Sequence, residues 1–124
     1  MPNRYGRATE AETQKTLFQL AGYYPELKLM FAIPNGGSRN KIEGKHLKEQ
    51  GVKAGVPDIF LPIAKNGYHG LFLELKVEKN KLSKQQSEWI ENLKKQGYKA
   101  VVAYGIDEAI KVLMEYIKNE NRVN

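Results

Sequence analysis

No cysteine occurs among the 124 residues of the sequence. Its absence excludes disulfides, zinc–thiolate sites and thiol catalysis, and it fits a reducing compartment. Long apolar runs are missing too, since none approaches the roughly 20 residues that a membrane-spanning helix requires. The N-terminal stretch MPNRYGRATEAE also lacks the apolar core of a signal peptide. These absences predict a cytoplasmic protein with no membrane partner.

Acidic residues are outnumbered, with 14 Asp and Glu against 20 Lys and Arg, so the formal net charge is +6. A polyanion such as a nucleic acid is a compatible partner, but small basic proteins are common and lysines also promote solubility. The hydrophobic content of 41% and the charged content of 27% are ordinary for a globular protein. The length predicts a single domain spanning residues 1–124.

Apolar periodicity and turn signals predict a chain that mixes helices and strands. Helices are expected over residues 9–22, 40–50 and 84–96, and after Asp107. Strands are expected over residues 27–33, 58–63, 70–77 and 98–104. This order predicts an α/β fold in which a mixed sheet of about four strands is flanked by helices.

Three of the expected helices begin with a capping signal. Thr9 and Glu12 have the spacing of a capping box, and Ser83 precedes the third helix, which Gly97 is expected to end. Asp107 is expected to cap the last helix.

Charged residues stand within the expected strand GLFLELKV. Side chains alternate between the two faces of a strand, so Glu74 and Lys76 project the same way while Leu73 and Leu75 face the other side. Taken alone, this pair is best explained as a mild ion pair on a surface strand. Asp58, at the start of the preceding strand, changes that interpretation if a hairpin brings it close to Glu74.

The turn of this hairpin decides whether Asp58 reaches Glu74. Asn66-Gly67 indicates a two-residue turn. That turn alone would place Asp58 opposite Leu75, on the wrong face. Asp58 opposes Glu74 only if the connection is effectively odd in length or contains a bulge.

Two carboxylates and a lysine on one face suit metal-assisted hydrolysis. Mg²⁺ takes oxygen ligands, is commonly held by one or two carboxylates, and completes its shell with water and substrate phosphate. Such an ion can activate water, and a neighbouring lysine can orient that water or stabilise developing negative charge.

Several motifs together resemble a known nuclease family. GVPDIFL followed by LFLELK is similar to the Pro-Asp…Glu-x-Lys signature of the PD-(D/E)XK nuclease superfamily. With IPNGGSR, GVKAGVPD and LSKQQSEWIENLKKQGYKAVVAYGIDEAI, the chain resembles the VRR-NUC domain, the virus-type replication-repair nuclease module, over about residues 9–117. The resemblance implies a restriction-endonuclease-like core.

The resemblance also implies roles for individual residues. Asp58 and Glu74 would bind the metal with the main-chain carbonyl of Leu75, and Lys76 would be catalytic.

An acidic residue in the first helix is implied as well, and either Glu10 or Glu12 could supply it. Helical phase favours Glu10, which lies on the inward stripe with Leu17 and would act on the metal through water, whereas Glu12 fits the capping box.

A glutamine on the helix after the Glu-x-Lys motif belongs to the family pattern and corresponds to Gln86. It has a second explanation, because Ser83 and Gln86 also form a capping box. The two roles are compatible, since Gln86 lies at the inner, N-terminal end of its helix.

The residues expected to contact DNA are small, polar or basic. A loop of small residues lets the backbone approach a phosphate, although it could equally be a flexible loop beside a solvated helix. The candidates are Asn35, Gly36, Gly37, Ser38, Arg39, Lys41, Lys45, Lys53 and Lys79.

The function implied by the resemblance is a divalent-metal-dependent endodeoxyribonuclease using Mg²⁺ or Mn²⁺ and leaving 5′-phosphate ends. Small stand-alone members are similar to Holliday-junction resolvases, so branched DNA is the expected substrate and a second copy the expected partner, in a bacterial or phage-infected cell. The alternatives are a flap- or end-directed repair nuclease and a non-catalytic DNA-binding module. Asp58, Glu74 and Lys76 argue against the last, because a pure binder needs none of them.

Overall fold

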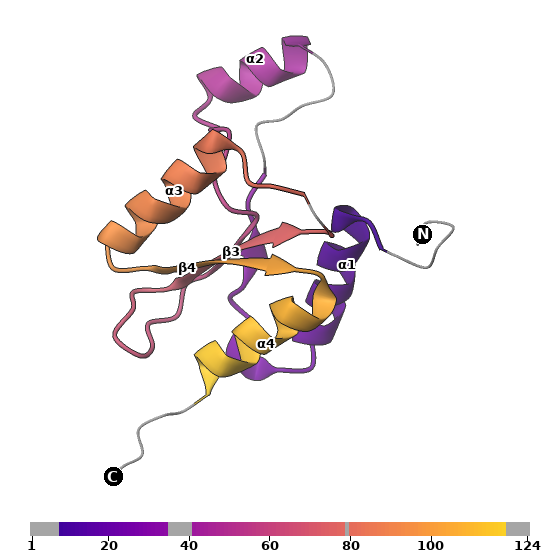
Figure 1. Cartoon of the computed structure of the whole chain (residues 1–124), viewed down its shortest axis with the longest axis vertical. Helices are drawn as coiled ribbons and strands as arrows, with labels where there is room; N and C mark the ends of the chain where they lie inside the picture. The colour runs from indigo at the N-terminus through magenta and orange to yellow at the C-terminus, as the bar shows by residue number, and fades with distance from the viewer. Residues whose placement is uncertain (1–7, 35–40, 79, 119–124) are drawn as a thin grey trace.

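The computed structural model describes residues 8–34, 41–78 and 80–118. Its elements, shown in Figure 1, are α1 (Glu10–Ala21), a 3-10 turn η1 (Pro25–Leu27), β1 (Phe31–Ala32), α2 (Lys41–Glu49), β2 (Ile59–Leu61), β3 (Leu71–Lys76), α3 (Lys84–Lys95), β4 (Lys99–Tyr104) and α4 (Ile106–Ile117). None of the helices in these described ranges is long and apolar enough to cross a membrane.

One four-stranded sheet with the order β1-β2-β3-β4 organises the chain. The first three strands are antiparallel neighbours, and β4 runs parallel to β3 after a crossover through α3. In Figure 1, α3 covers one face of the sheet while α1 and α4 cover the other, and α2 stands away from the sheet beyond one end of α3. The predicted α/β class with a mixed sheet between helices is confirmed.

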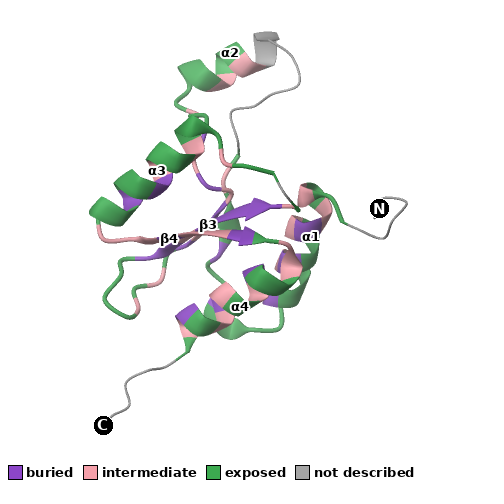
Figure 2. Ribbon diagram, in the orientation of Figure 1, coloured by how far each residue is buried: buried purple, intermediate pink, exposed green. Residues whose placement is uncertain are grey.

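The alternation of side chains along β3 divides the core into two clusters. Leu71, Leu73 and Leu75 are essentially inaccessible and pack with residues of α1 and α4. Phe72, on the opposite face, packs with the apolar side of α3. Figure 2 shows the resulting burial of β3. Because both faces of this central strand are covered, any charged side chain on it is removed from water.

Three predicted boundaries were wrong. The strand expected over 27–33 is only Phe31–Ala32, because Pro25 starts a 3-10 turn and the chain turns again where the Met30 amide donates to the Leu27 carbonyl. The strand expected over 58–63 ends at Leu61, just before Pro62. Asp107 is not a cap: Gly105 occupies the N-cap position of α4, with φ of 89°, and Asp107 lies in the first turn.

The capping signals of α1 and α3 are confirmed. The Thr9 hydroxyl accepts from the Glu12 amide and the Glu12 carboxylate accepts from the Thr9 amide. Ser83 and Gln86 make the same reciprocal pair at α3, and Gly97, with φ of 92°, follows the end of that helix. The first turn of α3 is therefore held in a defined place beside the sheet.

Gly55 fixes the loop before β2 against this first turn. Its φ is +92°, and a Cβ at this position would lie 2.7 Å from the Cβ of Gln85. We expect Gly55→Ala to lower the free energy of unfolding by about 3 kcal/mol. Gly51→Ala is the matched control, because Gly51 also has a positive φ but open space around it, and it should cost only about 1 kcal/mol. Equal losses in urea denaturation would show that the contact with α3 contributes nothing.

Candidate active site

The hairpin of β2 and β3 adopts the register that the site requires. Its pairs are Ile59 with Leu73, Phe60 with Phe72, and Leu61 with Leu71. One further step places Asp58 opposite Glu74. Directly opposed residues share a face, so the two carboxylates converge on the side of the sheet that α3 covers.

This register coexists with the two-residue turn at Asn66-Gly67. Both turn residues have positive φ, and Lys65 pairs with Tyr68 across them. The extra residue lies at Pro62, where the Ile63 amide donates to the Leu61 carbonyl at 2.9 Å and closes a three-residue turn. This kink makes the connection effectively odd.

Backbone hydrogen bonds show that Asp58 and Glu74 form a closely spaced pair. The Asp58 carbonyl accepts from the Ile33 amide at 2.7 Å, so the backbone groups of Asp58 face β1 rather than β3. In an antiparallel ladder such a pair is of the non-hydrogen-bonded kind, with Cα atoms about 4.5 Å apart. The side chains of such pairs approach each other closely, as a shared metal would require.

The backbone of Leu75 belongs to the same arrangement. Its amide donates to Oδ2 of Asp58 at 2.8 Å, which fixes the orientation of that carboxylate. In the ladder register Leu75 opposes Pro57, and both backbone groups of such a residue face the neighbouring strand. Pro57 has no N–H to offer the Leu75 carbonyl. The carbonyl therefore faces the Asp58 side of the hairpin without a ladder donor from Pro57.

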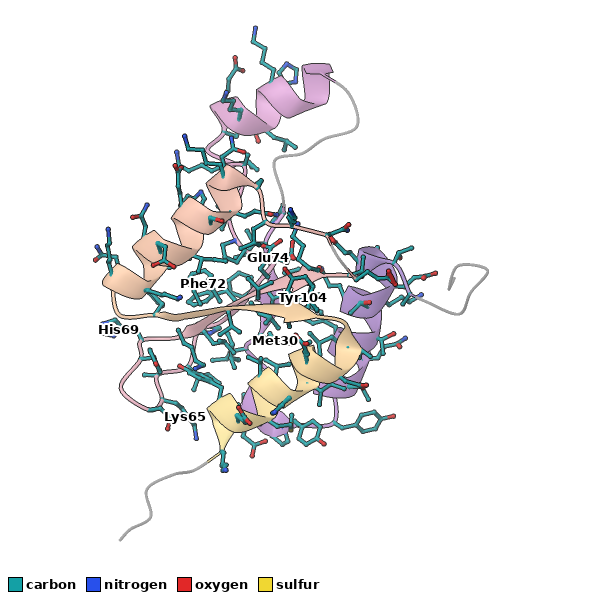
Figure 3. All side chains as sticks on the ribbon, viewed as in Figure 1. Met30, Lys65, His69, Phe72, Glu74 and Tyr104 are labelled. Carbon is teal, nitrogen blue, oxygen red and sulfur yellow. The ribbon has the colours of Figure 1, made fainter. Side chains whose placement is uncertain are left out.

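Among the residues whose burial is described, Glu74 is the charged one least exposed to water, with 2% of its surface accessible. Figure 3 shows it between the sheet and α3, on the same side as Phe72. Its Oε2 accepts a hydrogen bond from Nε2 of Gln86 at 2.9 Å. Its Oε1 is buried with no hydrogen-bond partner among the described residues. A buried oxygen left in this way costs free energy unless a ligand satisfies it.

Burial and like charge disfavour ionisation of both acids. Burial raises the pKa of Glu74 to about 8, and the charge of Asp58 adds to the effect. Burial also raises the pKa of Asp58, although the hydrogen bond from the Leu75 amide acts in the opposite direction and lowers that pKa. Lys76, which is 9% exposed, lowers both pKa values by its charge. In the metal-free site the balance therefore favours the protonated form of Glu74 up to a pH of about 8.

Gln86 caps its helix and also contacts Glu74. Its Oε1 accepts from the Ser83 amide at 2.8 Å while its Nε2 donates to Glu74, so the capping box and the contact with Glu74 use opposite ends of one amide. The helix cap therefore orients the Gln86 side chain, and Gln86 in turn orients the carboxylate of Glu74.

The two acids of α1 are separated by the structure. The charge of Glu10 raises the pKa values of Asp58 and Glu74, which places it near the pair. The side-chain Nδ2 of Asn80 also donates to Oε2 of Glu10, at 3.5 Å. Glu12 is engaged in the capping box with Thr9. The position of Glu10 suits an acid that acts through an intervening water.

Most of the expected DNA contacts cannot be placed. Lys45 and Lys53 are exposed, on α2 and in the loop that follows it. Lys41 is the first residue of α2, and the structure describes only its backbone. The candidates outside the described residues are Asn35, Gly36, Gly37, Ser38, Arg39 and Lys79.

Tyr104 was not anticipated from the sequence. The parallel pairing of β3 and β4 sets it beside Lys76, and it is 40% exposed at the end of β4 (Figure 3). No short-range signal could identify it, because the register of a crossover pair depends on how α3 packs between the two strands.

The residues present fit a hard divalent cation. Among the described residues no three His, Cys, Asp or Glu side chains are close enough to hold an ion between them, so side chains alone would supply only the pair Asp58 and Glu74. A cation would give the unsatisfied Oε1 of Glu74 a partner, and its charge would favour the ionised form of both acids, which burial disfavours. Mg²⁺ is commonly held by one or two carboxylates together with waters and substrate oxygens.

Comparison with known proteins agrees with this geometry. The model of the VRR-NUC domain matches residues 13–107, a segment that contains Asp58, Glu74 and Lys76 but begins after Glu10. A solved structure described as a VRR_NUC domain protein superposes with a TM-score of 0.77 and 35% identity, covering 89% of this chain and 88% of that one. No curated protein sequence is similar enough to count as a relative. Matched in sequence and in fold over most of its length, the chain belongs to the VRR-NUC family, whose domain is a nuclease of the PD-(D/E)XK type.

Proposed function

We propose that the chain is a divalent-metal-dependent, structure-selective endodeoxyribonuclease that acts on branched DNA, resolvase-like, as a homodimer. The observation that carries the catalytic part is the pairing of Asp58 with Glu74 across β2 and β3, with Lys76 on the same face.

The residues of the chain divide the chemical work among them. Asp58, Glu74 and the Leu75 carbonyl would hold Mg²⁺ or Mn²⁺, with Glu10 acting through water. When bound, the ion supplies a Lewis acid beside the phosphodiester and lowers the pKa of water.

Two contacts orient the ligands before DNA arrives. The Leu75 amide holds Asp58, and the Gln86 amide holds Glu74. The Lys76 ammonium, whose charge acts on both acids, would orient the attacking water or stabilise the charge that develops on the phosphate.

Burial of Glu74 argues against a non-catalytic DNA-binding module. A carboxylate with an unsatisfied, buried oxygen lowers the stability of the protein, and it contributes nothing to contact with phosphate, which it repels. A surface that only binds DNA would be served better by a neutral residue at this position.

Paired incision of a junction requires more than one site. The chain carries a single Asp58–Glu74 pair, so two cuts in opposed strands would come from two copies related by a twofold axis. Analytical ultracentrifugation of the protein alone and on a four-way junction tests this part of the proposal. A monomer in both states would remove the homodimer and leave the single-site nuclease.

A substrate panel tests the function. Four-way junction, flap, splayed and linear duplex DNAs are incubated with Mg²⁺, with Mn²⁺ or with EDTA, and the cut positions are mapped. We expect metal-dependent cuts near the branch of junctions, in symmetric pairs. Cutting of flaps or ends alone would favour a different repair nuclease, and no cutting of any substrate would refute the nuclease.

Gln86 is expected to affect the rate beyond its effect on the helix cap. Gln86→Ala removes the hydrogen bond to Glu74, and loss of such an orienting contact should slow cleavage by about 10- to 100-fold. Ser83→Ala removes the other half of the capping box and serves as the control, with a loss of about 1 kcal/mol of stability and a nearly normal rate. Equal rates for the two variants would assign Gln86 to the cap alone.

A further inference from the structure

A groove of about 680 Å³ runs beside the edge strand β4, outside the catalytic pair. Its walls are α3, which contributes Ile90 and Lys94, and β4 from Lys99 to Val102. Tyr68, from the hairpin turn, closes one end. β4 is the last strand of the sheet, and among the described residues no further strand lies beyond it (Figure 1).

The groove follows β4 from Val102, which pairs with Glu74, to Lys99, which pairs with Leu71 and shares its face of the sheet. Tyr104 lies two residues beyond the Val102 end of this lining. In the parallel pairing, Lys76 lies beside Tyr104 and Leu71 lies beside Lys99. Val102 precedes Tyr104 by two residues, so both side chains are on the face that α3 covers. Five steps along β4 measure about 17 Å, the length of about five stacked nucleotides of one strand.

The chemistry of the far end suits a single nucleic-acid strand. The Lys99 ammonium lies 5.3 Å from the ring centroid of Tyr68, and that ring is 36% exposed. The lining contains two cations, Lys94 and Lys99. Lys94 forms an ion pair with Glu91 at 3.4 Å on the surface of α3. Lysines that track phosphates and aromatic rings that stack on bases are the two elements of single-strand binding.

We propose that this groove binds an unpaired DNA strand that leaves the catalytic residues. Tyr104 would contact the nucleotide nearest the cut, and Tyr68, Lys94 and Lys99 would hold the nucleotides beyond it. The inference rests on the proposed nuclease function and specifies the feature that such a nuclease would select, a strand that has left the duplex at a branch. A strand that is still paired cannot present its bases to the tyrosine rings.

An added protein strand fits this edge less well. Lysine on an edge strand opposes pairing with another chain, and Lys99 stands at the start of β4. The charged residues of the lining are Lys94, Lys99 and Glu91, so two lysines against one glutamate leave a net positive charge, which is complementary to phosphate.

Binding measured without cleavage tests the groove. Fluorescence anisotropy in EDTA follows duplexes that carry a single-stranded arm of increasing length, up to about eight nucleotides. The wild type should gain about 10-fold in affinity as the arm grows to about five nucleotides, and then level off. Lys94→Glu combined with Lys99→Glu should lose this gain.

A matched variant separates the groove from general charge. Lys15→Glu combined with Lys111→Glu changes the net charge equally on α1 and α4, away from the hairpin turn that carries Tyr68, and should keep the dependence on arm length. Circular dichroism checks folding, and Lys94→Gln with Lys99→Gln replaces the reversal variant if that one unfolds.

Three results would overturn the proposal. The gain with arm length could survive in the groove variants, it could disappear equally in the control variant, or the groove variants could change only the oligomeric state, which would make the groove a protein interface. Because EDTA prevents cleavage, the measurement can be read whether or not the substrate panel finds a nuclease.

Discussion

Replacing Glu74 with glutamine is expected to lower the cleavage rate by about 10³-fold or more, which corresponds to about 4 kcal/mol of transition-state stabilisation. The side chain keeps its size, and its carbonyl can still accept from Gln86, so the fold and the hydrogen bond survive. What is lost is half of the negative charge available to a metal. Single-turnover cleavage of the best panel substrate at saturating Mg²⁺ measures the effect.

The controls for this prediction come from the same chain. Glu88→Gln makes the same chemical change at an exposed position of α3 and should leave the rate unaltered. Lys76→Met removes the ammonium but retains an apolar stem of similar length, and we expect a loss of about 10²-fold or more. Full activity in both Glu74→Gln and Lys76→Met would exclude this site as the catalytic centre.

The metal-free protein is expected to lose stability as the pH rises from about 5 to 9. Glu74 has a pKa of about 8 when folded and 4.5 as its ordinary value, so the folded state binds its proton more tightly than the unfolded state. The resulting stabilisation is fully present below the ordinary pKa and is lost as the pH rises through the folded one. Asp58 is shifted in the same direction. We expect a loss of about 4 kcal/mol, equivalent to a fall in Tm of roughly 15 °C.

Thermal unfolding in EDTA, repeated with Mg²⁺ and with Glu74→Gln, isolates this effect. The variant should be more stable than the wild type at pH 9, because it removes a buried charge and keeps the hydrogen bond. Mg²⁺ should raise the Tm of the wild type most at high pH, where both carboxylates are ionised, and should raise that of the variant little. Parallel pH profiles for the two proteins would show that Glu74 is not the group responsible.

These two predictions have one physical origin. β3 is covered by α3 on one face and by α1 and α4 on the other, so its charges are held out of water. A carboxylate in that position lowers the stability of the metal-free fold, and it binds a cation strongly because it lacks competing water. The stability lost in the absence of metal is recovered when a cation satisfies the unpaired oxygen of Glu74.

Local patterns in the sequence predicted most of the helices and strands, and they identified most of the residues of the candidate site. The capping boxes at Thr9 and Ser83 depend on residues three positions apart, and the structure contains both. The placement of Glu74 and Lys76 on one face follows from alternation within a single strand. The two-residue turn at Asn66-Gly67 also followed from its composition, because both residues tolerate positive φ.

Longer-range features were not accessible in this way. The strand expected over 27–33 is mostly a turn, because Leu27 and Met30 are buried by tertiary packing and not by a pleated strand. Asp107 lost the N-cap to Gly105, whose positive φ lets the chain turn sharply from β4 into α4.

The sequence by itself determined the fold class, the starts of α1 and α3, and the residue types of the site: two carboxylates, a lysine and a glutamine on elements that could bring them together. Only the tertiary structure decided that they meet. The kink at Pro62 sets Asp58 opposite Glu74, the packing of α3 brings Gln86 to Glu74, and the pairing of β4 with β3 puts Tyr104 beside Lys76. Each of these contacts depends on register or docking between separate elements, which the burial of both faces of the sheet enforces and which no local pattern encodes.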